Sequence, residues 1–109
     1  SIDSEARFYI VEPDVKASFN GEGVEGFYKW LFSKMARPKG CEHQGTMKVS
    51  FVIGTDGKVT DVKILESICE ELDNMVVSVI KNSPAWEPAK VKGKPVEWAV
   101  KMPFVFELR

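Results

Sequence analysis

The stretch that decides the fold is residues 46–66, TMKVSFVIGTDGKVTDVKILE. In its first half the apolar residues alternate with others, as in a strand that buries one face: Met47, Val49, Phe51 and Ile53. Asp56 and Gly57 then supply the residue types of a two-residue hairpin turn. This stretch therefore predicts an antiparallel β-hairpin.

The returning half of the hairpin contains an irregularity. Val59 falls on one parity of the strand, whereas Val62 and Ile64 fall on the other. One extra residue in the strand would bring all three to the same face. The pattern therefore predicts a β-bulge near residues 60–61.

Helical periodicity precedes and follows the hairpin. Residues 24–35 carry apolar side chains at spacings of three and four: Val24, Phe27, Tyr28, Leu31 and Met35. Residues 71–81 repeat the pattern before the stop signal at residues 82–84, with Leu72, Met75, Val76, Val79 and Ile80. Two helices are therefore expected.

A long alternating strand follows and runs nearly to the C-terminus. Its apolar residues share one parity: Val96, Trp98, Val100, Met102, Phe104, Phe106 and Leu108. Pro103 lies on the opposite parity and cannot donate a ladder hydrogen bond, which favours an edge position in the sheet. Together these elements predict an α+β fold, a three-stranded antiparallel sheet with two helices packed on one face.

Length and charge limit the classes of function. The chain has 109 residues, which suits one domain, with residues 1–23 expected as an extended lead-in segment and residues 24–109 as the folded domain. Its net charge of −1 argues against nucleic acid or an anionic membrane as a partner. Its apolar runs are far shorter than the roughly 18 residues of a membrane span.

Reactive residues do not assemble into a catalytic pattern. His43 is the only histidine and lies in a polar loop, so a histidine-based triad or metal cluster has no second member. Asp56 is explained by the hairpin turn. We therefore expect no enzymatic activity, no cofactor and no metal site.

Several motifs together are similar to those of a known family. They are FVIGTDGKVTDVKIL at 51–65, ELD at 71–73, PAWEPAK at 84–90, GKPV at 93–96 and PFVFEL at 103–108. In order and spacing they closely resemble the C-terminal domain of TonB energy-transducer proteins. The resemblance covers residues 45–108.

The resemblance implies a periplasmic domain, tethered to the inner membrane in the full-length protein. Such a domain binds the TonB box of an outer-membrane transporter and transmits force from an inner-membrane proton-driven motor. Recognition would occur by strand addition to the predicted edge strand, whose exposed backbone groups suit this mode. The expected partner-binding residues are Val96, Trp98, Ala99, Val100, Lys101, Met102, Phe104 and Phe106.

Two other functions fit the same features. The family also occurs as a module of other membrane proteins, so the domain could serve as a periplasmic peptide-binding or sensing module. Alternatively, it could be a structural domain that forms a homodimer through its own strand edge. Linkage to proton-channel components would favour the transducer, and a preceding peptidase domain would favour the sensor.

Cys41 and Cys69 are expected to form a disulfide. Both cysteines leave the same end of the hairpin and are only a few residues out of its register, so a short Cα separation is attainable. The periplasm that the resemblance implies is oxidising and would preserve the bond. The alternative is two unpaired thiols, with Cys69 packed beneath the second helix.

Overall fold

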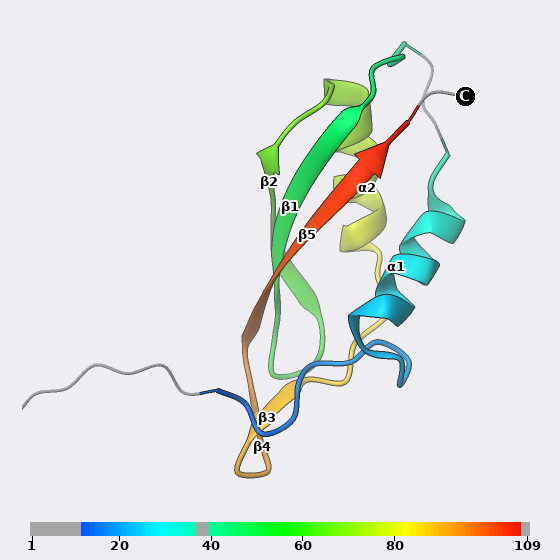
Figure 1. The fold of residues 1–109 in the computed structure, drawn as a ribbon. Coiled ribbons are helices and arrows are strands. Elements are labelled where there is room, and N and C mark those ends of the chain that lie inside the picture. The colour runs from blue at the N-terminus through cyan, green and yellow to red at the C-terminus, as the bar shows by residue number, and fades with distance from the viewer. Residues whose placement is uncertain (1–11, 37–39, 108–109) are drawn as a thin grey trace, which may run out of the picture.

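The computed structural model describes residues 12–36 and 40–107, so residues 1–11 of the predicted lead-in and the strand end at Leu108 lie outside the described residues. The predicted hairpin and both helices are confirmed (Figure 1). The elements are α1 (Gly23–Lys34), β1 (Gly45–Ile53), β2 (Val59–Glu66), α2 (Glu70–Lys81), β3 (Ala89–Val91), β4 (Lys94–Val96) and β5 (Trp98–Phe106).

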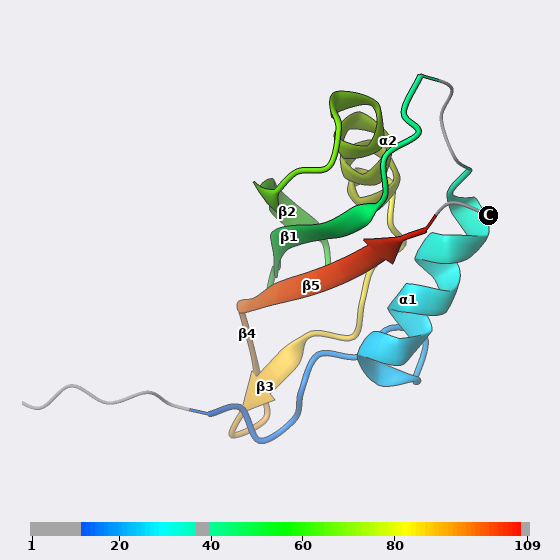
Figure 2. The same ribbon diagram turned by 45° about the horizontal axis from the view of Figure 1, so that its top comes forward.

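The main sheet has the strand order β2-β1-β5, and both pairings are antiparallel. β1 is therefore central, and β5 lies at one edge, as the position of Pro103 predicts. The β1–β5 register is regular from Gly45 opposite Phe106 to Ile53 opposite Trp98. Figure 2 shows β5 at the margin of the sheet, with α1 alongside it.

The hairpin has the predicted bulge but a different turn. Asp61 adopts a positive φ of 52° where the β1–β2 register shifts, which confirms the bulge. The loop, however, has three residues: Gly54 donates to the carbonyl of Lys58 at 2.9 Å, and Gly57 donates to the carbonyl of Gly54 at 2.9 Å. The predicted two-residue turn is wrong because Gly57, at φ 83°, forms the left-handed residue of a longer loop.

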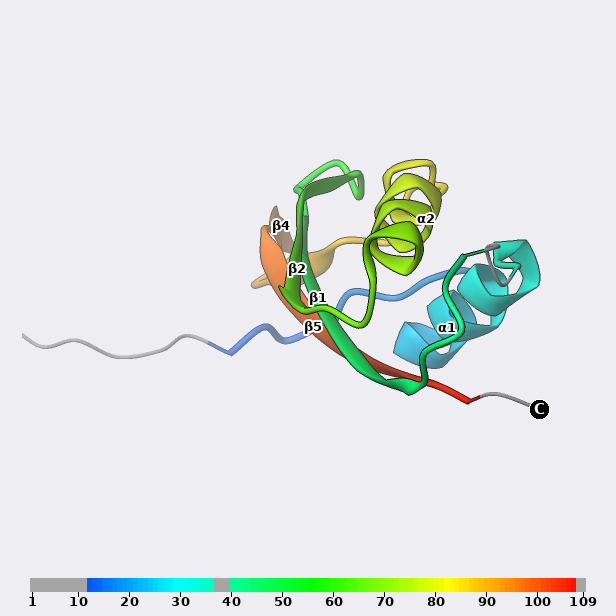
Figure 3. The ribbon, with the colours of Figure 1, turned by 90° about the horizontal axis from the view of Figure 1, so that it is seen from above.

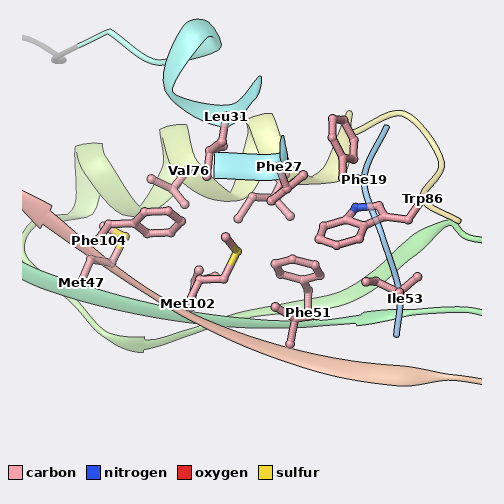
Figure 4. Close-up of a cluster of buried hydrophobic side chains, with 14 of the residues drawn as sticks. Phe19, Phe27, Leu31, Met47, Phe51, Ile53, Val76, Trp86, Met102 and Phe104 are labelled. Atoms are coloured by element: carbon pink, nitrogen blue, oxygen red, sulfur yellow. The ribbon is translucent and has the colours of Figure 1, made fainter. Parts of the chain in front are cut away.

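The core lies between the sheet and the helices. Figure 3 shows both helices on the same side of the sheet. Buried side chains of β1 and β5 point toward them, and the ring of Phe51 lies 5.5 Å from that of Phe27 in α1 (Figure 4). The buried hydrophobic residues of the strands and helices are Phe27, Leu31, Met47, Val49, Phe51, Ile53, Leu72, Val76, Ile80, Ala89, Val100, Met102 and Phe104.

A small second sheet interrupts the long strand predicted to begin at Val96. β3 and β4 pair as a hairpin, in which Val96 lies opposite Ala89. Lys92 and Gly93 form its turn, with positive φ values of 51° and 79°. The predicted strand start is therefore wrong, because Val96 is used by this hairpin and β5 begins only at Trp98.

The segment before α1 packs on the domain. Val15 and Ser18 form isolated bridges with Lys90 and Glu87. The Phe19 side chain is 6% exposed, and its ring lies 5.5 Å from that of Trp86. The predicted boundary between residues 23 and 24 therefore falls within the packed unit, because aromatic contacts join the segment to the core.

Cys41 and Cys69 form a disulfide in the structure, with their Cα atoms 6.4 Å apart. Cys69 also precedes α2 as its N-cap, and its sulfur accepts a hydrogen bond from the backbone N–H of Leu72 at 3.4 Å. The bridge thus ties the segment before β1 to the start of α2.

Candidate functional site

The outer edge of β5 presents backbone groups that no strand of the described chain pairs. Gly54 directly follows β1, and its N–H points toward Lys58 across the hairpin. Because backbone groups alternate in direction along a strand, the even-numbered residues of β1 also point their N–H and C=O groups toward β2. The odd-numbered residues of β1 turn to β5, where they pair with even-numbered residues, for example Met47 with Phe104. The odd-numbered residues of β5 must then face outward: Ala99, Lys101, Pro103 and Val105. We call this row of backbone groups the β5 edge.

Pro103 interrupts the row of donors on the β5 edge. It lies opposite Lys48 at a position where the two strands exchange no hydrogen bonds, so its missing N–H costs the sheet nothing. On the outer side, the N–H donors that remain belong to Ala99, Lys101 and Val105.

Tyr28 of α1 contacts the β5 edge at this same residue. Its hydroxyl donates to the carbonyl of Pro103 at 3.3 Å, and its ring meets that of Phe104 edge-on at 5.6 Å. Burial, and then the negative charge of Glu25, raise the pKa of Tyr28, so the hydroxyl keeps its proton at neutral pH. Pro103 therefore separates the edge into one section at Ala99 and Lys101 and another at Val105.

Most side chains of the predicted binding set do not face outward. Val100, Met102 and Phe104 are at most 6% exposed and point into the core. Trp98 and Phe106 are half-buried, and Val96 belongs to β4. Ala99 and Lys101 are the exposed members of the set.

Sequence reasoning missed Val105 and Tyr28 as residues of this site. Val105 is 65% exposed and contributes an outward N–H, and strand parity relative to Pro103 would have identified it. Tyr28 has no such signal in the sequence, because its contact joins residues 75 positions apart.

The part of the chain that the structure describes offers few clustered side chains that could bind a metal ion. The one cluster there with three metal-ligand side chains consists of Cys41, Cys69 and Glu71. Its two sulfur atoms are joined to each other and so offer no thiolate. No helix among the described residues is long and apolar enough to span a membrane. The absence of enzymatic activity stays a prediction.

Known proteins share sequence features and the fold of this chain. The family model "Gram-negative bacterial TonB protein C-terminal" matches residues 31–108. Two NMR solution structures of the Helicobacter pylori TonB C-terminal domain are similar in fold. The one of residues 179–285 has 23% identity, a TM-score of 0.60, and coverage of 79% of this chain and 80% of that one. The one of residues 194–285 has 24% identity, a TM-score of 0.57, and coverage of 77% and 91%. No curated protein sequence matches the chain.

Proposed function

Because the chain belongs to the family of Gram-negative bacterial TonB protein C-terminal domains, we propose that it is the periplasmic domain of a TonB-like energy transducer. It binds the TonB box of an outer-membrane transporter by strand addition. In the full-length protein, anchored in the inner membrane, it transmits force from a proton-driven motor. The observation that carries the proposal is the β5 edge, with its row of outward-facing backbone groups.

The β5 edge accounts for both affinity and selectivity of strand addition. Backbone hydrogen bonds to Ala99, Lys101 and Val105 supply the affinity. Because Val100, Met102 and Phe104 are buried, the partner does not meet their side chains. Selectivity therefore depends on exposed side chains along the edge.

Titration with a TonB-box peptide tests this function directly. We expect the largest amide chemical-shift changes at Ala99, Lys101 and Val105, whose N–H groups point toward the added strand. Changes confined to the solvent-facing side of α1 would contradict strand addition. Edge signals that depend on protein concentration without peptide would instead support the homodimer, the second candidate for the same edge.

A pair of proline variants separates binding from folding. Lys101→Pro removes an outward donor without loss of a bond to β1, as Pro103 does naturally, so the domain should fold and bind the peptide about tenfold more weakly. Val100→Pro removes an inward donor opposite Phe51 and should abolish the native fold. Circular dichroism and isothermal titration calorimetry measure the two effects.

The opposite pattern would refute the outward and inward assignment. If Lys101→Pro unfolds the domain while Val100→Pro leaves it folded, the two parities of β5 are exchanged. If Lys101→Pro folds and binds with unchanged affinity, the Lys101 donor takes no part in recognition.

A further inference from the structure

A pocket lined mostly by residues with apolar side chains lies where β5 ends beside the last turn of α1. Its volume is about 390 Å³. The residues that line it belong to α1 and the two residues after it, to α2, and to the end of β5 and the residue after it: Phe32, Met35, Ala36, Met75, Val105, Phe106 and Glu107. We call this the terminal pocket.

The terminal pocket is continuous with the β5 edge. Val105 belongs to both, since its backbone groups point outward and it also lines the pocket. In a strand added along β5, each residue points to the same face of the sheet as the residue opposite it. The residue opposite Phe106 would therefore point toward the helices, into the space between Phe106 and α1.

The lining of the terminal pocket specifies the chemistry of its occupant. Phe32 is 50% exposed, an unusually high fraction for such a large apolar side chain. The Phe32 ring is held edge-on against Phe104 at 5.9 Å, so it offers a fixed surface. Glu107 is the one charged residue of the lining. A large apolar side chain fits this environment, whereas an acidic side chain would meet Glu107.

We infer that the terminal pocket anchors a large apolar side chain of the bound strand, at the position opposite Phe106. The inference rests on the proposed function and specifies its partner further. The domain selects extended segments that pair with the Ala99, Lys101 and Val105 backbone and carry an aliphatic or aromatic residue at this position. Pro103 and Tyr28 mark the point between the two sections of the edge.

The methyl signals of the methionines report directly on whether the terminal pocket is occupied. Met35 and Met75 line the terminal pocket, whereas Met47 is fully buried in the core and lies outside it. In a domain with ¹³C-labelled methionine methyl groups, a TonB-box peptide should shift the signals of Met35 and Met75 and leave that of Met47 in place. Replacement of the anchoring peptide residue by alanine should abolish these shifts.

Three variants at two exposed positions of the domain test the pocket. Ala36 is exposed, so Ala36→Trp fills the pocket from its rim, and Ala36→Ser is the matched control of nearly unchanged size. We expect Ala36→Trp to weaken peptide binding about tenfold and Ala36→Ser to leave it unchanged. Phe32→Ala should weaken binding similarly, and its effect should vanish with the alanine-substituted peptide, as in a double-mutant cycle.

The outcomes distinguish this inference from the proposed function. If the peptide shifts the Ala99, Lys101 and Val105 amides but neither pocket methionine, strand addition stands and the anchor is wrong. If it shifts none of these signals, the proposed function fails as well. If Met35 and Met75 shift with protein concentration in the absence of peptide, a second copy fills the pocket and the inference is overturned.

Discussion

Replacement of Gly57 by alanine should lower the free energy of unfolding by about 3 kcal/mol or more. A Cβ atom at this position would lie 2.0 Å from the carbonyl oxygen of Trp86, a distance that no side-chain rearrangement relieves. The close approach is held by a hydrogen bond from the N–H of Trp86 to the carbonyl of Gly57 at 2.8 Å. Trp86 in turn packs against Phe27 in the core, with ring centroids 4.8 Å apart. Urea denaturation measures the loss.

Gly93 provides the matched control for this effect. It also has a positive φ, 79° against 83° for Gly57, but a Cβ there would meet no atom within 4 Å. Gly93→Ala should therefore cost only the backbone strain, about 1 kcal/mol. Equal losses in the two variants would show that the contact with Trp86 contributes nothing.

Reduction of the Cys41–Cys69 disulfide should lower the free energy of unfolding by about 3.5 kcal/mol. The bridge spans 28 residues and restricts the unfolded chain, so most of its effect comes from the entropy of that state. Urea denaturation of the same protein with and without a reducing agent measures the difference and keeps both sulfur atoms in place.

A double variant controls for effects of the reducing agent. Cys41→Ala with Cys69→Ser removes the bridge, while the serine hydroxyl can still accept the hydrogen bond from Leu72 at the start of α2. The urea concentration at its unfolding midpoint should be about the same as for the reduced protein. If reduction leaves the unfolding midpoint unchanged, the bridge does not constrain the unfolded chain.

The sequence predicts those elements whose periodicity extends over several residues. Alternation across residues 46–53 is long enough to define β1, and the change of parity between Val59 and Val62 locates the bulge at Asp61. β3 and β4 have three residues each, too few to show a period. The pairing of Ser18 with Glu87 joins distant segments that carry no local signal.

The candidate site is predictable to the level of one strand. Pro103 is enough to place β5 at an edge, because a proline there needs no ladder bond. Which of its backbone groups face outward follows only from the register with β1. The contact of Tyr28 with Pro103 and the terminal pocket both depend on where α1 packs, and helix periodicity alone does not determine this.

The disulfide also limits how far the chain can extend under tension. If tension were applied to the two ends of the chain, it would pass from Cys41 to Cys69 through one covalent link and bypass the hairpin between them. A stretch of 28 residues, about 90 Å when fully extended, could not be drawn out. In single-molecule pulling, the oxidised domain should release less contour length than the reduced domain by about this amount. If the domain transmits force as we propose, the bridge reduces the length by which the domain itself extends under the pull.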